Sequence, residues 1–150
     1  MALIDLITPD VIKIPLESNT KTGVLRELTE VLVNAKKIES EESGPVFDAL
    51  MQRESLGSTG LEKGIAVPHC KTPHVTSLTL AIGIAPGGID FDAIDGEPST
   101  LFFCMLAPPD QSGPHIEALA EIARLTQSQS FCRLLKESQS PEEVVELFRD

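Results

Sequence analysis

The stretch Gly57-Ser-Thr-Gly-Leu-Glu-Lys-Gly-Ile-Ala-Val-Pro-His69-Cys-Lys71 joins a glycine-rich loop to a short apolar strand that stops at a proline and a histidine. Pro68 has no N–H group for a sheet hydrogen bond, so we expect strand pairing to fail there. Pro68 also pushes Val67 towards extended backbone. The pattern therefore predicts that His69 lies at the mouth of a strand rather than inside a sheet, where ligands of α/β sheets usually bind.

The residues before this stretch predict one strand and two helices. Apolar residues alternate over 12–16, which indicates a short strand, and recur at helical spacing over 24–35. Thr20 or Thr22 is the expected cap of that first helix. A second apolar stripe over 46–51 follows Pro45, which a helix tolerates in its first turn. We expect this second helix to end near residues 53 and 54, just before the glycine-rich loop.

The residues after His69 predict two strands and then three helices. Residues 78–84 alternate as a strand that closes at 86–88, and the Asp95-Gly96 pair is a hairpin signal. The continuous apolar run 101–106 is typical of a strand buried on both faces. A helix from about Pro114, capped by Ser112, is expected to bury Ile116, Leu119, Ile122 and Ala123. Short helices follow at 131–136 and from Ser140-Pro141, where Ser140 and Glu143 have capping-box spacing.

This order of elements predicts the fold class. The 150 residues are enough for one domain with its own core, and no repeat or linker divides residues 1–150. Helices on both sides of the strand block need both faces of a small sheet to cover, and the hairpin signal makes some pairing antiparallel. We predict a single α/β domain with a small mixed β-sheet and helices on both faces.

Charge and composition exclude several classes of function. The formal net charge is −11 and the chain has no Trp or Tyr, so we expect no nucleic-acid partner. No segment approaches the ~20 apolar residues of a membrane span, and the N-terminus lacks the pattern of a signal peptide, so no membrane insertion is expected. The three cysteines are widely spaced and odd in number, which indicates reduced thiols and a cytoplasmic location.

The residues around His69 suit an anion. The Ser58-Thr59 loop offers hydroxyl and N–H groups, and His115 falls in the first turn of a predicted helix, where the dipole favours negative charge. A phosphoryl group on an imidazole needs a neutral ring nitrogen, a fixed second nitrogen and positive potential, which Arg53 also supplies. Each residue also has a purely structural interpretation, and from the chemistry alone both interpretations stay open.

Two other kinds of chemistry have weaker support. His69, Cys70, His74 and His115 are metal-ligand types, but neighbours in extended chain point to opposite faces and no zinc spacing is present. We therefore expect no metal and no cofactor. A Cys70 nucleophile with a histidine base is supported only by the coexistence of the two residue types. Cys104 lies in the most apolar run and is interpreted as core packing.

Two segments together resemble a known family. The segment from Arg53 to Gly60 with Gly64-Ile-Ala-Val-Pro-His69 is similar to the signature of type-2 IIA components of the bacterial phosphoenolpyruvate-dependent phosphotransferase system. The second segment comprises 91–98, 106–112 and His115-Ile-Glu-Ala-Leu-Ala120. The resemblance covers nearly the whole chain and is closest to the nitrogen-regulatory branch.

The resemblance implies a role for each residue. His69 matches the phosphorylated histidine, His115 the second active-site histidine and Arg53 the site arginine. Ser58 and Thr59 are phosphate-stabilising candidates from their own chemistry rather than from the resemblance. The family takes its phosphoryl group from the histidine-containing phosphocarrier protein. It passes the group to a IIB component during sugar uptake, or acts as a regulator that binds target proteins. A domain that keeps the fold without phosphorylation is a further alternative. Cys70 departs from the glycine that usually follows the active histidine.

Overall fold

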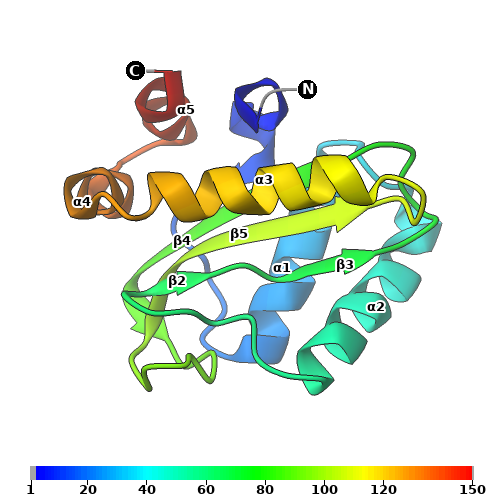
Figure 1. Ribbon diagram of the computed structural model, residues 1–150, viewed down its shortest axis with the longest axis horizontal. Helices are drawn as coiled ribbons and strands as arrows, with labels where there is room; N and C mark the ends of the chain where they lie inside the picture. Colours follow the sequence, from blue (N-terminus) through cyan, green and yellow to red (C-terminus); the bar gives the residue numbers. More distant parts are fainter. Residues whose placement is uncertain (1–2, 150) are drawn as a thin grey trace.

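A five-stranded mixed sheet lies between two layers of helices in the computed structural model, which describes residues 3–149 (Figure 1). The strand order is β1-β4-β5-β2, and β3 pairs with β5 as well. The strands are β1 (Ile12–Lys13), β2 (Ile65–Ala66), β3 (His69–Lys71), β4 (Thr79–Ile89) and β5 (Ser99–Ala107). The helices are α1 (Lys21–Asn34), α2 (Ser43–Ser55), α3 (Ser112–Leu125), α4 (Gln129–Glu137) and α5 (Pro141–Arg149). Short 3-10 turns span Leu3–Leu6, Pro9–Val11 and Ser40–Glu42.

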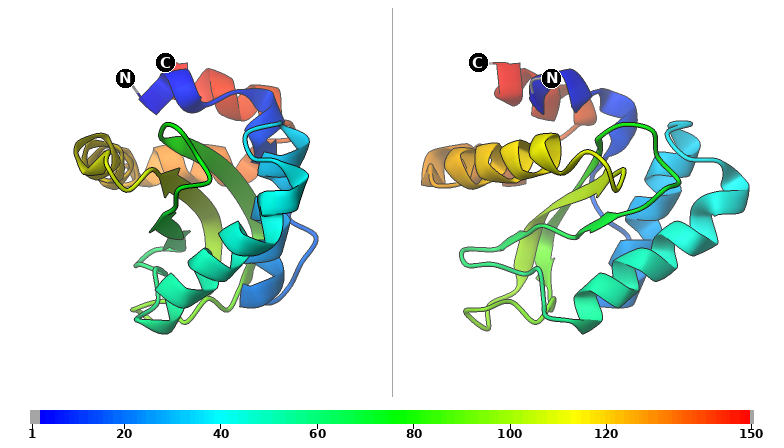
Figure 2. Two further views of the ribbon diagram at one scale, coloured as in Figure 1. Left: turned by 90° about the vertical axis from the view of Figure 1, so that its right-hand side faces the viewer. Right: turned by 45° about the vertical axis from the view of Figure 1, so that its right-hand side comes forward.

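The helices cover opposite faces of the sheet. Figure 2 shows α1 and α2 on one side of the strands and α3 and α4 on the other. Helix α1 packs on α2 and β4, whereas α3 and α4 pack on β5. The two ends of the described chain lie close together, and α5 packs against the turn Pro9–Val11. The predicted α/β class, with a mixed sheet and helices on both faces, is confirmed.

Strand β5 is the centre of the sheet. From Leu101 to Ala107 every residue is buried, as the continuous apolar run predicts. β5 pairs antiparallel with β4 and parallel with β2 and β3. The connection from β4 carries the predicted turn, in which Gly96 has a φ of 75° that a glycine adopts without strain.

Strand pairing resumes directly after Pro68, which corrects one prediction. Residues 67 and 68 interrupt the strand, but His69 is the first residue of β3 and pairs with Met105 of β5. Pro68 cannot donate a hydrogen bond, yet its carbonyl oxygen accepts one from the Met105 N–H at 2.9 Å. His69 therefore belongs to the sheet, and its ring is placed by the strand rather than by a loop beyond it.

Two further predictions are wrong in detail. Strand β4 does not close at 86–88 but continues to Ile89 after a register shift, with Gly88 at a φ of 80°. Helix α3 buries His115, Ala118 and Ile122, while Ile116 is 65% exposed and Ala123 is also exposed. The buried stripe is thus rotated, because the helix turns a histidine towards the sheet.

The predicted helix caps have a mixed outcome. The Thr20 hydroxyl accepts a hydrogen bond from the Gly23 N–H, and the Ser140 hydroxyl accepts one from the Glu143 N–H at 3.2 Å, as the sequence predicts. Ser112 is the first residue of α3 instead of its cap, and Gln111 precedes it without a side-chain cap. The N-terminus of α3 therefore keeps N–H groups without a side-chain partner from the cap position.

Candidate functional site

Two imidazole rings meet between β3 and α3. The ring centroids of His69 and His115 lie 5.4 Å apart, and the ring planes make an angle of 75°. His69 comes from the first residue of β3, and His115 from the first turn of α3, which begins near the end of β3 (Figure 1). The packing of α3 beside β3 thus brings together two histidines that are 46 positions apart in the sequence.

The backbone fixes the tautomer of His69. Its Nδ1 atom lies 2.7 Å from the carbonyl oxygen of Val67, and a carbonyl oxygen can only accept a hydrogen bond. Nδ1 therefore carries the proton, and in the neutral ring Nε2 carries the lone pair. The side chain is only partly buried, so an incoming group can approach it. The arrangement presents one nucleophilic nitrogen in a defined orientation.

His115 is buried and has an unpartnered nitrogen. The residue is 5% exposed, and its Nε2 atom is buried without a hydrogen-bond partner. Burial, followed by the neighbouring His69 and Lys71, lowers the pKa of His115 below its usual 6.5. A neutral His115 offers one N–H donor and one lone pair beside His69, so it can donate a hydrogen bond to an oxygen bound there.

The lowered pKa of His115 predicts a loss of stability in mild acid. Below about pH 6.5 the unfolded chain protonates this ring before the folded chain does, so the free energy of unfolding falls as the pH drops towards the folded-state pKa. We expect urea unfolding at about pH 7.5 and about pH 5.5 to show a larger loss for the wild type than for His115→Gln. Equal losses in both proteins would contradict the lowered pKa.

Lys71 belongs to the same site and was not predicted. It lies two residues after His69 on β3, so both side chains leave the same face of the strand. Its Nζ atom donates a hydrogen bond of 2.8 Å to the Ser112 hydroxyl at the start of α3. The lysine thus places a positive charge beside the two imidazoles. The alternation of residues 69 and 71 along a strand was the available signal in the sequence.

Cys70 points away from the two histidines. It is buried and lines a shallow pocket with Ala49, Arg53 and Leu56 on the α2 side of the sheet. Burial raises the pKa of the Cys70 thiol to about 12, so the thiol stays protonated at neutral pH. A protonated, inward-facing thiol is a poor nucleophile, which argues against the cysteine-hydrolase alternative. No group of three metal-ligand side chains occurs within residues 3–149.

We predict that replacing Cys70 with alanine leaves the chemistry of His69 intact. The side chain packs on the face opposite to the two imidazoles, so its loss should cost about 1 kcal/mol of folding free energy, typical of a point substitution. Native iodoacetamide labelling should be slow at Cys70, and urea unfolding measures the stability change. Rapid labelling at neutral pH would contradict the raised pKa.

Arg53 borders the strand that carries His69. It lies in the last turn of α2, lines a pocket with Cys70 and Lys71, and its Nη1 atom donates to the Gly57 carbonyl oxygen at 2.8 Å. The guanidinium group has further donors beyond that one bond. The structure thus brings the two histidines into ring contact and places Arg53 beside β3, at the end of α2, where it bonds the loop that follows the helix.

The hydroxyl groups of Ser58 and Thr59 both donate hydrogen bonds to other groups of the protein. Ser58 Oγ donates to the carbonyl oxygen of Phe91 at 2.6 Å. Thr59 is buried, and its hydroxyl and N–H groups both bond to the carboxylate of Glu54. Their predicted role towards phosphate stays a prediction, while their observed role is to fasten the glycine-rich loop.

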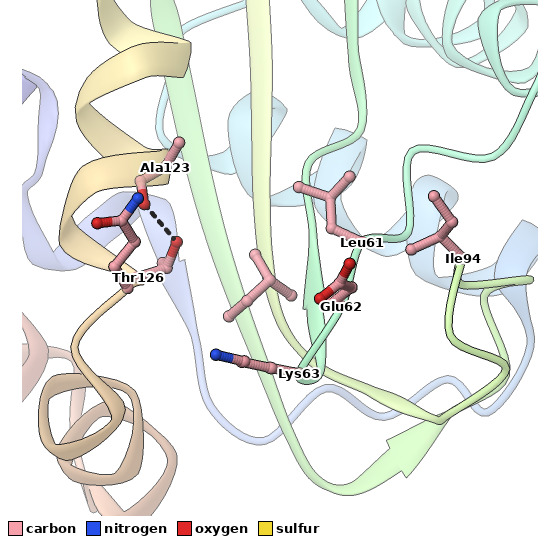
Figure 3. A pocket seen from close by; sticks show the side chains of 8 residues that line it. Leu61, Glu62, Lys63, Ile94, Ala123 and Thr126 are labelled. Atoms are coloured by element: carbon pink, nitrogen blue, oxygen red, sulfur yellow. Dashed lines mark hydrogen bonds between the residues drawn. The ribbon is translucent and has the colours of Figure 1, made fainter.

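An apolar pocket lies away from the two histidines, at the other end of α3. Leu61 and Ile94 face Ala123 and Thr126 across it, and Thr126 hydrogen-bonds the Ala123 carbonyl oxygen at 3.3 Å (Figure 3). None of the predicted site residues lines it. Glu62 and Lys63 are the titratable residues that line this pocket, whereas His69, Lys71 and His115 lie together at the start of α3.

The chain matches one family over almost its full length. The family described as "Phosphoenolpyruvate-dependent sugar phosphotransferase system, EIIA 2" matches residues 5–150. A nitrogen regulatory protein of Bradyrhizobium diazoefficiens is 34% identical over 96% of this chain and 92% of its own length. The fructose-specific EIIABC component of Bacillus subtilis is 32% identical over 98% of this chain, which spans only 23% of that longer relative.

The fold comparison agrees with the sequence comparison. The crystal structure of the nitrogen regulatory protein IIA-Ntr from Neisseria meningitidis superposes with a TM-score of 0.86 and 31% identity, over 97% of both chains. Within residues 3–149, no helix is long and apolar enough to cross a membrane. The shared fold and the match across both motif segments lead to one conclusion: the chain belongs to the EIIA type-2 family of the phosphoenolpyruvate-dependent phosphotransferase system.

Proposed function

We propose that this protein is a phosphohistidine carrier that accepts a phosphoryl group on Nε2 of His69 from the histidine-containing phosphocarrier protein. The observation that carries the proposal is the hydrogen bond of 2.7 Å between His69 Nδ1 and the Val67 carbonyl oxygen. That bond holds the proton on Nδ1 and leaves the Nε2 lone pair for phosphorus. Family membership supports the same role.

The transfer of the phosphoryl group between the two histidines needs no separate general acid or base. The Nε2 lone pair of His69 forms the new N–P bond as the N–P bond of the donor histidine breaks. The donor imidazole keeps the bonding electron pair as its own lone pair, and each ring retains its N–H proton. Positioning and electrostatic stabilisation then do most of the catalytic work, as is general for phosphoryl transfer.

Three groups surround the expected position of the phosphoryl oxygens. His115 offers an N–H donor, Lys71 supplies a positive charge, and the start of α3 presents backbone N–H groups with a favourable dipole. Arg53 has donors left over after its bond to Gly57 and lines a pocket with Lys71, so it would add positive charge beside β3 without contacting either imidazole. These groups would stabilise the oxygens as negative charge collects on them.

We assign the output of the carrier to regulation. The nitrogen regulatory relative matches along nearly all of both chains, and the motif segments resemble that branch. Phosphorylation adds about −1.5 to −2 charges at one point. On a protein of net charge −11 this change can switch the choice of a target protein without refolding. The match to the fructose-specific component supports the alternative, in which the group passes to a IIB component.

Phosphoryl uptake tests the carrier role directly. The protein is incubated with phosphoenolpyruvate and the two general phosphotransferase proteins, and intact mass spectrometry follows the addition of one phosphoryl group. We expect a mass gain that is lost in acid and retained in alkali, and that peptide mapping places on His69. A protein that gains no such mass is a non-phosphorylated interaction domain.

A second assay separates the two outputs. The phosphorylated protein is mixed with IIB domains of the fructose and mannitol type, and the transfer of label is followed over time. In parallel, the bare and phosphorylated forms are compared for binding to candidate target proteins. A regulator should transfer slowly to both IIB domains and bind a target with different affinity in the two forms, whereas a sugar-specific carrier should transfer rapidly to one IIB domain.

A further inference from the structure

The carboxylate of Glu54 is buried in the last turn of α2 and directs both oxygens to one loop. The residue is 7% exposed. Its Oε1 atom accepts a hydrogen bond from the Thr59 N–H at 3.1 Å and lies 3.1 Å from Lys21 Nζ, while Oε2 accepts from the Thr59 hydroxyl. A buried carboxylate is tolerated only when it is paired and hydrogen-bonded in this way.

Three hydrogen bonds, joined through the backbones of Thr59 and Val67, link this carboxylate to His69. The carbonyl oxygen of Thr59 accepts from the Val67 N–H at 3.0 Å. The carbonyl oxygen of Val67 then accepts from His69 Nδ1 at 2.7 Å. An antiparallel bridge between Gly60 and Ala66 holds the same two segments together. The carbonyl that orients the His69 ring thus belongs to Val67, whose N–H group is held by the loop that the Glu54–Thr59 pair fastens.

We propose that Glu54 is a positioning residue for His69. Glu54 holds the loop that contains Thr59, and this loop in turn holds Val67. The Val67 carbonyl then selects the His69 tautomer in which Nδ1 carries the proton and Nε2 the lone pair. The expected effect on the rate of phosphoryl uptake rests on the proposed function. The expected effect on the tautomer does not, because it is a property of the bare protein.

If Glu54 positions His69, then Thr59 links the two residues rather than binding phosphate. Its hydroxyl and its N–H group both donate hydrogen bonds to the Glu54 carboxylate, and its carbonyl oxygen accepts one from the Val67 N–H. Lys21 has other partners, since it also lies 3.4 Å from Asp92 and 4.9 Å from the centroid of the Phe91 ring. Loss of the carboxylate should therefore release Thr59 more than it releases Lys21.

The chain offers matched variants for a test. Glu54→Gln keeps the shape but leaves one acceptor oxygen for two donors of Thr59, and puts an amide N–H group in place of the other oxygen. Thr59→Val removes the hydroxyl group and nearly keeps the shape of the side chain, whereas Thr59→Ser keeps the hydroxyl group. Asp92→Asn is the control, because Asp92 pairs with the same lysine and is exposed, and its carboxylate makes no hydrogen bond to Thr59 among the described residues.

Two measurements are made on each variant after circular dichroism has established that it folds. The ¹⁵N chemical shifts of the His69 ring report which nitrogen carries the proton. The initial rate of phosphoryl uptake reports the consequence. We expect Glu54→Gln and Thr59→Val to show a mixture of both tautomers and uptake slowed by about 10-fold, in the range typical of residues that support a reacting group. Thr59→Ser and Asp92→Asn should match the wild type.

The measurements distinguish failure of the positioning role of Glu54 from failure of the proposed carrier function. A folded Glu54→Gln protein with the wild-type tautomer and rate overturns the positioning role, and so does an equal effect of Asp92→Asn. If Glu54→Gln does not fold, Thr59→Val decides by the same two measurements. If the wild type accepts no phosphoryl group, the proposed function fails, and the tautomers of the bare proteins still decide the role of Glu54.

Discussion

Replacing His69 with alanine should lower phosphoryl uptake by more than about 1,000-fold, to the level of the chemical background, because the variant lacks the proposed attacking nitrogen, Nε2 of His69. The fold should survive, since the imidazole is only partly buried and the strand pairing of residue 69 with Met105 is a backbone interaction. Intact mass spectrometry after incubation with phosphoenolpyruvate and the two general phosphotransferase proteins measures the loss.

The third histidine is the matched control. His74 pairs with Glu42 at 2.7 Å, and neither residue touches His69 or His115 in the hydrogen-bond and ring contacts of residues 3–149. His74→Ala should keep the rate of uptake within about threefold of the wild type, as expected for a substitution outside the site. If His74→Ala abolished uptake and His69→Ala did not, the acceptor would be misassigned.

Much of the fold follows from patterns that are local in the sequence. The apolar run 101–106 predicts a doubly buried strand, and β5 is the strand on which β2, β3 and β4 all pair. The cap at Thr20 and the opening of α5 at Pro141 follow from side chains that bond backbone within a few residues. Such features need no knowledge of the rest of the chain.

Two of the errors concern the site itself. Hydrophobic periodicity assigns Ile116 to the buried stripe of α3, yet the helix buries His115 and exposes Ile116. A hydropathy rule treats histidine as a surface residue, so it fails where an imidazole must face a second imidazole. The missing N–H group of Pro68 predicts the end of strand pairing, but the Pro68 carbonyl still accepts a ladder hydrogen bond, and His69 continues the sheet.

The partners of the supporting residues do not follow from spacing, even where, as for Lys71, the alternation along a strand indicates which face the side chain is on. Lys71 bonds Ser112 across 41 positions, a contact set by the docking of α3 beside β3. Glu54 looked like an ordinary polar residue at a helix end, and only its burial against the Thr59 loop reveals its contacts. The motifs predict that His69 and His115 share a site, and the structure brings the two rings together, whereas the residues that hold them in place depend on packing between elements.

Replacing His115 with alanine should slow phosphoryl uptake by about 100-fold while leaving His69 able to react. Its Nε2 atom is the one buried side-chain nitrogen without a hydrogen-bond partner among residues 3–149, and it belongs to the ring that contacts His69. A donor that meets the transferred group only during the reaction contributes about 10²–10³-fold to the rate. The single-turnover rate of uptake, measured by rapid quench, tests this prediction.

A pair of amide variants separates the donor from the bulk of the ring. The side-chain nitrogen of glutamine can reach about the position of the histidine Nε2 atom, whereas that of the shorter asparagine cannot. His115→Gln should therefore keep uptake within about 10-fold of the wild type, and His115→Asn should be as slow as His115→Ala. Wild-type rates in a folded His115→Ala protein would show that the second imidazole is only a packing element. Equal losses in the glutamine and asparagine variants would show that the shape of the ring, and not its N–H group, is what the transferred phosphoryl group requires.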